Sequence, residues 1–443
     1  MKKMLSMILT ILLLVSVFPT TVLGDSTVSI EVTPQFAGNR NGSIEISWQP
    51  CPAHSLFSTN EARVAYLETR IREWCEQNPD VKINIIETTS NNVENMAKTL
   101  IQVTEGRAAD VVSIDSYAFP NFVQYAQPMT DVFDKYGIEK DDFFPFVQDA
   151  AYDGDTALGL WYTTDVRSLY YRKDLIPTPP ATWAELQEMA IGVTEEYGID
   201  GYLFPGGKNE NLVLNSLIFF WAMGGELVDG DKPIFADGEN YDRWIKVMEH
   251  YTEMVNSGAS PARVITLEQP PLEDMVSGSV AFDIDGNFVA SSMKNMLGLE
   301  AYNALWGVAP IPMPEEGMHM NVSGGWINTI FTTDEVKRQT AADFVTYIYG
   351  DNDGMNGWCS NGGYLPTRKP VYEVSEYFSS DPEAQFFKSE LDFANVRPAA
   401  PIYQTISAEM SNYISEYLSG SMTAQEALDT ARDNVNKAYE AMQ

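Results

Sequence analysis

The sequence contains few basic residues, and this shortage excludes a class of partner. It has 28 Lys and Arg against 62 Asp and Glu, which gives a formal net charge of -34 at pH 7. A chain with this charge repels polyanions, so nucleic acid is excluded and an anionic membrane surface is a poor partner. The excess of acid is most simply a solvated surface, and a salty habitat or a cationic ligand would also explain it.

Cysteine and histidine are also scarce, and they form no metal-binding spacing. There are three of each, with no CxxC pair, and the histidines stand far apart. The motifs HExxH, GxSxG and GxxxxGK[ST] are absent, so nothing indicates a metalloprotease, a hydrolase nucleophile or a phosphate-binding loop. No metal, cofactor or catalytic group is therefore predicted. Cys75 is expected in the core, whereas Cys51 and Cys359 fall on loops where a disulfide is an open possibility.

No long, unbroken apolar run occurs beyond the N-terminus. Lys2 and Lys3 precede an apolar run from Met4 to Phe18. Pro19 ends this run, and Gly24 is the small residue after which cleavage is expected. This three-part pattern predicts a signal peptide over residues 1–24, and the run is too short for a membrane-spanning helix. Because no cysteine lies at the cleavage point, a lipid anchor is not expected. The protein is predicted to be exported, to a periplasm or to the outer face of the cytoplasmic membrane.

The remaining chain alternates strand and helix patterns. Residues 25–42 are polar and are predicted to form a tether, and strands are then expected at 43–48, 81–86 and 110–115 with helices between them. The run at 110–115 is continuously apolar, as in a buried parallel strand. This order predicts an α/β fold with right-handed crossovers, and the length suits two or three domains of about 150 residues each.

Three capping boxes mark predicted helix starts. They are Ser58-x-x-Glu61, Thr182-x-x-Glu185 and Thr423-x-x-Glu426. Further strands are expected at 157–175, 279–288, 306–314 and 323–331, and an amphipathic helix closes the chain.

Several stretches, in this order, resemble the extracellular solute-binding family that includes maltose-binding protein. They are ADVVSID, GLWYTTDVRSLYYRKDLIPTPPATWAELQEMA, GGELVDG, MVSGSVAFDIDGNF, WGVAPIPMP, SGGWINTIFTT, GGYLPTRK and SGSMTAQEALDTA. Together they cover nearly all of 43–443, and LYYRKDLIPTPPATWAEL is the most specific. The resemblance implies a two-lobed periplasmic-binding-protein fold, type II-like, with the ligand cleft between discontinuous lobes. The implied lobes are 43–160 plus 323–365, and 161–322 plus 366–443.

The resemblance also implies a function. It predicts a monomeric binding protein, not an enzyme, that captures a sugar or oligosaccharide, closes by a hinge motion and delivers its ligand to the permease of an ABC transporter. Two alternatives stay open. One is a binding protein for a non-sugar, cationic solute, and the other is a secreted carbohydrate-active enzyme with a similar aromatic cleft.

A sugar cleft needs aromatic rings for the C–H faces and polar groups for the hydroxyls. The chain has 9 Trp, 22 Tyr and 21 Phe to supply them. Ligands of open α/β sheets bind beyond the carboxyl ends of strands, which favours Trp48, Gln49, Asp115 and Tyr117. Trp48 could instead be a core side chain, and Asp115 a helix cap.

The resemblance adds further cleft candidates. Asp165 matches an acidic sugar-contacting position of the family, and Phe288 takes the place of a stacking Trp. The others lie near the three crossings, on an apolar helix or at an Asp-Gly turn: Trp161, Trp221, Asp285, Trp326, Tyr364 and Arg368. Trp221 could belong to the core, Asp285 could hold its turn, and Arg368 could form an ion pair between the lobes.

Overall fold

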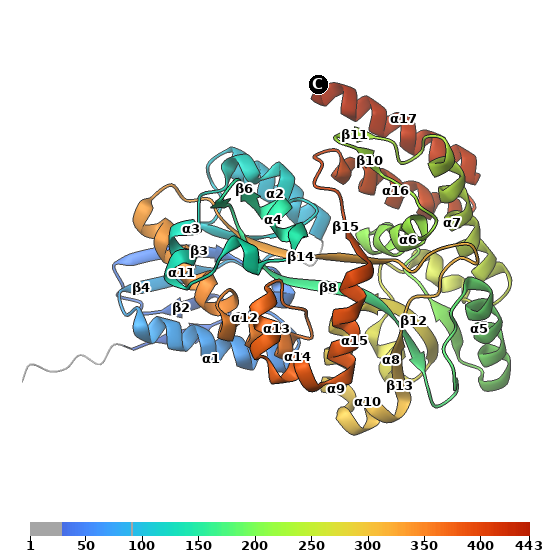
Figure 1. The fold of residues 1–443 in the computed structure, drawn as a ribbon, viewed down its shortest axis with the longest axis horizontal. Coiled ribbons are helices and arrows are strands. Elements are labelled where there is room, and N and C mark those ends of the chain that lie inside the picture. Colours follow the sequence, from blue (N-terminus) through green and yellow to red (C-terminus); the bar gives the residue numbers. More distant parts are fainter. Residues whose placement is uncertain (1–28, 90–91) are drawn as a thin grey trace, which may run out of the picture.

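The computed structural model describes residues 29–89 and 92–443, so the predicted signal peptide lies outside the described residues. The chain forms two α/β halves that lie side by side, and two long strands run through both (Figure 1). The first half, at the left of the view, contains the N-terminal strands, and the second half carries the C-terminal helix. Within the described ranges, no helix is both long enough and apolar enough to span a bilayer.

One mixed sheet connects the halves. Its strand order is β1-β2-β4-β3-β5-β14-β8-β12-β9, with β13 also paired to β8 and β15 to β14. Strand β3 is parallel to β4 and β5, as the strand–helix alternation predicted. The long strands β8 (Leu160–Arg172) and β14 (Asn321–Ile330) are antiparallel to each other at the centre.

The first half places helices on both faces of its strands. Helices α1 and α11 pack against β2 and β3, and α2 packs against β5. The strands are β1 (Glu31–Thr33), β2 (Phe36–Gly38), β3 (Ile44–Gln49), β4 (Val81–Ile85), β5 (Val111–Asp115), β6 (Tyr152–Asp153) and β7 (Thr156–Ala157). The helices are α1 (Glu61–Gln77), α2 (Asn92–Thr104), α3 (Thr130–Lys135), α4 (Pro145–Ala151), α11 (Glu335–Tyr349) and α12 (Asn352–Gly362).

The second half is built around β9, β12 and β13, with α5 against β9 and β12 and with α6, α7, α16 and α17 packed together. Its strands are β9 (Asp200–Leu203), β10 (Val228–Asp229), β11 (Lys232–Pro233), β12 (Val280–Gly286), β13 (Trp306–Ala309) and β15 (Ala394–Val396). Its helices are α5 (Trp183–Tyr197), α6 (Glu210–Ala222), α7 (Glu239–Asn256), α8 (Leu272–Ser277), α9 (Phe288–Leu297), α10 (Leu299–Leu305), α16 (Tyr403–Leu418) and α17 (Ala424–Met442).

Shorter elements complete the chain. Helices α13 (Lys369–Val374), α14 (Glu376–Ser380) and α15 (Pro382–Glu390) lead from the first half to the second. The short 3-10 helices are Pro52–His54, Phe119–Asn121, Val123–Tyr125, Lys140–Asp142, Ala262–Thr266 and Leu391–Phe393.

Two of the three predicted capping boxes form. Thr182 with Glu185 and Thr423 with Glu426 exchange the expected side-chain and backbone hydrogen bonds at the starts of α5 and α17. The box at Ser58 is wrong, because the helix cap lies two residues later, at Asn60, and α1 begins at Glu61. The Asn60 side chain accepts hydrogen bonds from two backbone N–H groups of the first turn, which satisfies donors that the helix itself leaves free.

The predicted tether is also wrong from residue 31 onward. Strands β1 and β2 form a hairpin, and β2 extends the sheet by pairing with β4. The reason is burial: Phe36 and Ala37 are covered by the first half, so this stretch contributes apolar area to the core despite its polar neighbours.

The chain crosses between the halves within β8, within β14 and after the first-half helix α12. Residues 366–372 still lie against the first half, because Arg368 pairs with Asp142 and Phe144 N–H donates to the Thr367 carbonyl. Glu383 already contacts the second half through Lys294 and Tyr302. The third crossing therefore comes later than the predicted residue 365.

The cysteines are buried free thiols. Cys75 lies in the core, as predicted, and Cys51 and Cys359 do not form the disulfide that the sequence left open. Burial raises the pKa of the Cys51 thiol to about 12, so this group stays protonated and inert at neutral pH.

Candidate functional site

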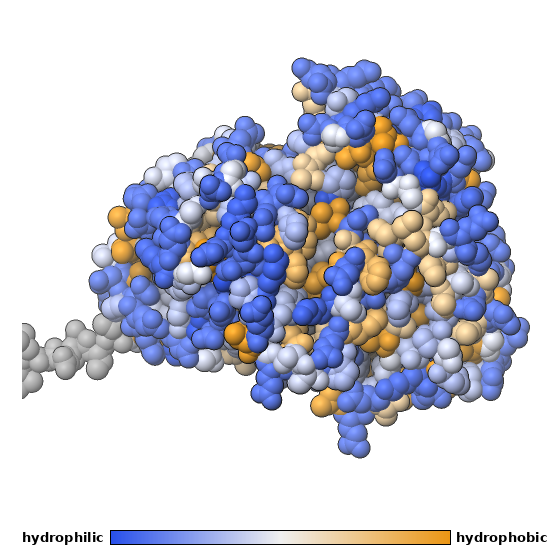
Figure 2. Space-filling model, viewed as in Figure 1, coloured by the Kyte–Doolittle hydropathy of each residue, from blue (hydrophilic) through white to orange (hydrophobic). Residues whose placement is uncertain are grey.

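A cavity of about 870 Å³ lies between the two halves, within the size range of small-molecule sites. Both halves and both long strands line it. Its wall includes Cys51, Pro52, Ala53, His54, Arg63, Glu94, Asp115, Tyr117, Thr163, Thr164, Asp165, Arg167, Lys208, Asn209, Glu210, Asn211, Leu214, Phe288, Ser323, Gly324, Gly325, Trp326, Tyr364, Arg397, Gln404 and Ser407. Hydrophilic residues cover most of the first half on the face in Figure 2, where a notch separates the halves at the top.

The antiparallel pair β8 and β14 forms the floor of this cavity. Asp165 lies opposite Gly324 in the register, and Thr164 lies opposite Gly325. A Cβ at Gly324 would stand 2.6 Å from Arg397 Nη2 and 3.7 Å from Asp165 Oδ1. The bare backbone at Gly324 therefore leaves room for the Arg397 guanidinium at the floor, whereas the Asp165 carboxylate would meet a Cβ only in ordinary contact. Gly325 has a φ of 144°, a conformation that side chains disfavour.

A buried charge cluster joins the halves at one end of the floor. Arg397, in the second half, donates from Nη2 to Asp115 Oδ1 at 3.0 Å and from Nη1 to Glu210 Oε1 at 3.1 Å. Glu210 also accepts hydrogen bonds from the hydroxyls of Tyr403 and Ser407. Because Asp115 ends β5 in the first half, the Arg397–Asp115 pair spans the cavity between the halves.

Tyr117 completes this end of the cavity. The Arg397 guanidinium lies 4.8 Å from the centroid of the Tyr117 ring, and the Tyr403 ring meets Tyr117 edge-on at 6.1 Å. Asn121 of the first half donates to Gln404 of the second at 3.0 Å nearby. These contacts add packing and one neutral hydrogen bond to the ion pair that joins the halves.

We expect Asp115 to make folding stability depend on pH. Burial raises the pKa of Asp115 from 3.8 to about 6; Arg397 opposes the rise and Glu210 adds to it. Between these values the folded protein holds the proton more tightly than the unfolded chain does, so stability falls as pH rises from about 4 to about 6. The loss attributable to this group is about 2–3 kcal/mol.

Urea unfolding between pH 4 and pH 7 measures this loss directly. Wild type should lose about 2–3 kcal/mol more than Asp115→Asn across the pH window, because the amide does not titrate. Parallel stability curves for the two proteins would contradict the assignment to Asp115.

Aromatic rings form another part of the cavity wall. Phe288, at the start of α9, meets Tyr364 with 5.6 Å between centroids and 36° between planes, and Trp358 stacks behind Tyr364 at 5.7 Å. Trp326 of β14 meets His54 edge-on at 5.8 Å. Phe288 belongs to the second half and Tyr364 to the first, so this wall also comes from both. Such a wall offers ring faces for C–H groups of a ligand.

The ionisable groups beside the aromatic wall have shifted pKa values. Burial, together with the nearby Arg63 charge, holds the pKa of His54 well below 6.5, so the imidazole is neutral at pH 7. Burial raises the pKa of Asp165 above 3.8, although Arg167 and Arg397 oppose the rise. Asp165 has no ion-pair partner among the described residues, and the Gly324 backbone N–H donates to it, so the remaining acceptor positions of the carboxylate can take hydrogen-bond donors of a ligand.

The structure brings some of the predicted site residues together and leaves others apart. The cavity wall includes Asp115, Tyr117, Asp165, Phe288, Trp326 and Tyr364. Trp48 is fully buried and packs edge-on against Phe344 of α11, so its alternative reading as a core side chain holds. Gln49 is buried and donates to Thr99 Oγ1 at 3.0 Å.

Four other predicted residues do not line the cavity. Trp161 is buried and donates to the Thr163 carbonyl at 2.9 Å, and Trp221 is buried within α6. Asp285 lies behind the wall, where it pairs with Arg167. Arg368 pairs with Asp142 at 2.6 Å inside the first half, so it forms neither a ligand contact nor an ion pair between the halves.

Sequence reasoning missed the basic residues of the cavity. Arg397 follows a three-residue strand and Arg63 lies in the first turn of a helix, and neither position carries a motif. Their positions depend on contacts between distant parts of the chain, because Arg397 meets residues 115 and 210 and Arg63 meets residue 362. For Glu210, the N-terminal turn of an apolar helix beside a Gly-Gly-Lys loop was the available signal.

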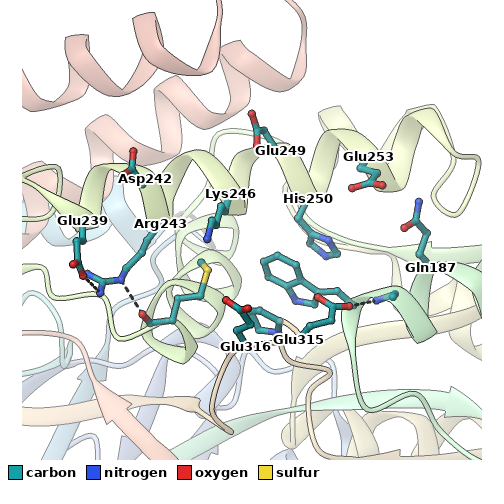
Figure 3. Close-up of a pocket in the computed structure, with 14 residues that line it drawn as sticks. Gln187, Glu239, Asp242, Arg243, Lys246, Glu249, His250, Glu253, Glu315 and Glu316 are labelled. Carbon is teal, nitrogen blue, oxygen red and sulfur yellow. Dashed lines mark hydrogen bonds and ion pairs between the residues drawn. The ribbon is translucent and has the colours of Figure 1, made fainter.

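A second hollow, of about 790 Å³, lies wholly on the second half (Figure 3). One face of α7 lines it, with Glu249, His250 and Glu253 among its residues, and Glu315 and Glu316 lie across from that helix. Its acids are exposed, and the His250 ring stacks on Trp183 at 3.9 Å. The described residues contain no cluster of His, Cys, Asp or Glu that could hold a metal ion.

Comparison with known proteins identifies the family of this chain and the known structures that its fold resembles. A model of the family described as bacterial extracellular solute-binding protein matches residues 69–386. The mannitol-binding protein of Pseudomonas aeruginosa is 23% identical over 390 residues, which cover 81% of this chain and 86% of the relative.

Solved structures resemble the fold over most of the chain. Maltose-bound MalE3 of T. maritima has a TM-score of 0.78 at 21% identity, covering 89% of this chain and 100% of that one. A tagatose-bound ABC transporter solute-binding protein of Thermotoga lettingae has a TM-score of 0.73 at 22% identity, covering 89% and 99%. UgpB of Mycobacterium tuberculosis with glycerophosphocholine has a TM-score of 0.74 at 14% identity, covering 90% and 100%. The predicted two-lobed α/β fold is confirmed.

Proposed function

The chain belongs to the bacterial extracellular solute-binding protein family, and from this premise we propose that it captures a sugar or oligosaccharide and delivers it to the permease of an ABC transporter. The observation that carries the proposal is the cavity between the halves, where the Phe288–Tyr364 wall faces a floor of polar groups such as Asp165. This combination suits a ligand with C–H faces and a rim of hydroxyls.

Three of the four relatives named above support a carbohydrate ligand. The named ligands among them include mannitol, maltose and tagatose. In our proposal the six predicted residues on the cavity wall contact the sugar, and the two halves close over it about the crossings in β8, β14 and residues 372–383. The protein acts as an exported monomer, and the permease binds the closed form.

We further propose that the protein binds without catalysis. The family is one of binding proteins, and the cavity acids Asp115 and Glu210 are occupied by the same arginine. Because their oxygens are held by the Arg397 guanidinium, these two carboxylates are not free to flank a glycosidic bond as the paired acids of a hydrolase do.

A thermal-shift screen of sugars against the mature protein tests the proposed function. A true ligand should raise the melting temperature by mass action and be recovered unhydrolysed. Phe288→Ala should weaken binding about 10- to 100-fold, since it removes a half-buried ring from the wall. Stabilisation by a polyamine but by no sugar would contradict the proposal, and product release from a glycan would favour an enzyme.

A further inference from the structure

Arg63 is a buried cation without a carboxylate partner in the wall of the ligand cavity. Its side chain belongs to the first turn of α1, it is 5% exposed, and it lines the cavity between the halves. Among the described residues, no Asp or Glu forms an ion pair with it. A buried charge is costly to leave without a counter-charge, so this position calls for an explanation.

The other buried arginines all have acidic partners. Within the described ranges these pairs are Arg167 with Asp285, Arg338 with Asp131, Arg368 with Asp142, and Arg397 with Asp115. The chain has 62 acidic residues against 28 basic ones, so acids are plentiful. Among the buried arginines of the described ranges, Arg63 therefore differs in having no acidic partner, and it lies in the wall of the cavity.

The protein holds Arg63 in place but does not neutralise it. Nε and Nη2 donate to the Gly362 carbonyl at 3.2 and 2.7 Å, and the guanidinium lies 4.9 Å from the centroid of the Tyr364 ring. Gly362 ends α12, whose C-terminal dipole supplies only about half of a negative charge. In the described structure Nη1 makes no hydrogen bond, which leaves a donor for a ligand.

We infer that Arg63 recognises an anionic group on the bound sugar, so that the ligand is an acidic saccharide such as a uronic acid. This inference rests on the proposed function and names the substrate class of the same cavity. A sugar ring against Tyr364 and Phe288 would place its carboxylate on Arg63. Its hydroxyls would donate to Asp165. Asp165 and Arg63 both lie close enough to the Tyr364 hydroxyl for their charges to act on its pKa, so one ligand could reach both. A planar guanidinium suits a carboxylate in geometry as well as in charge.

Calorimetric titration of matched sugars tests the inference. The full mature protein is titrated with galacturonic acid and its dimer, with galactose and its neutral dimer, and with galactose 6-phosphate. We expect the uronates to bind about 10- to 100-fold more tightly than their neutral counterparts, the range for a charge-assisted hydrogen bond. Tighter binding of the phosphate than of the uronate would identify phosphate as the anionic group.

Two variants test whether the preference for acidic sugars depends on Arg63. Arg63→Gln, which keeps an N–H donor for Gly362, should lower the affinity for acidic sugars about tenfold or more beyond any change in the affinity for neutral sugars, so that the preference is lost. Lys82→Gln is the control, since it removes a positive charge from a partly exposed pair with Glu45 on the same half, away from the cavity, and should leave the preference intact. If Arg63→Gln does not fold, the wild-type preference and its weakening by salt still decide the question.

The outcomes separate this inference from the proposed function. Equal or tighter binding of the neutral sugars would overturn the inference and leave sugar capture standing. An acidic preference that survives in Arg63→Gln would overturn the role of Arg63. Failure of every sugar to bind would overturn both.

Discussion

Replacing Arg397 with alanine is expected to lower the free energy of unfolding by about 3–5 kcal/mol at pH 7. Arg397 is 8% exposed and pairs with two carboxylates, Asp115 and Glu210, which are also buried. Removing the guanidinium leaves two negative charges close together without a counter-ion. The cost should be smaller near pH 4, where Asp115 takes up a proton in the folded protein.

Urea unfolding of Arg397→Ala beside Arg263→Ala measures this effect. Arg263 also pairs with two carboxylates, Asp200 and Asp274, but its side chain is 39% exposed. The exposed pairs should contribute less than about 1 kcal/mol in total, since solvent screens them. Equal losses in the two variants would contradict the claim that the buried cluster joins the halves energetically.

Trp48→Ala is expected to lower the free energy of unfolding by about 3–5 kcal/mol and to leave ligand affinity unchanged in the folded protein. Trp48 is 0% exposed and packs against Phe344 and Tyr349, with ring centroids at 5.3 and 6.3 Å. Its removal creates a cavity in the core of the first half, away from the cavity between the halves.

Phe288→Ala should show the opposite balance of effects to Trp48→Ala. Phe288 is half-buried on the cavity wall, so its loss should weaken binding while costing less stability than the loss of Trp48. Chemical unfolding gives the free energy of unfolding of each variant, and calorimetry gives its affinity for the ligand. A loss of affinity in Trp48→Ala equal to that in Phe288→Ala would contradict the placement of Trp48 in the core.

Comparison of Trp48 with Asp115 shows that a sequence pattern can select the end of a strand but cannot tell whether a side chain there faces the core or the cavity. Both residues lie at the carboxyl ends of parallel strands, Trp48 one residue before the end of β3 and Asp115 at the end of β5, and the rule that ligands bind beyond such ends selected both. Side chains alternate along a strand, however, and which face a terminal residue takes depends on the helix that covers it. Helix α11 covers Trp48, and it comes almost 300 residues later in the chain, so no local pattern could reveal the contact.

The same limit explains the missed arginines. The alternation of strands and helices predicted the α/β fold, and the family resemblance pointed to Phe288, which follows β12 and lines the cavity. Arg397 and Arg63 gain their roles only from pairing across the chain, since Arg397 meets residues 115 and 210, and Arg63 meets residue 362. Long-range charge pairing has no period in the sequence, so it had to be read from the structure.

The proposal as a whole depends on capture of a saccharide in the cavity between the halves. Calorimetric titration of the mature protein with acidic and neutral sugars, followed by mass spectrometry of the recovered ligand, tests it most directly. We predict saturable one-to-one binding that Phe288→Ala weakens, with the ligand recovered intact. Absence of binding by every sugar, or recovery of hydrolysed product, would contradict the proposed function.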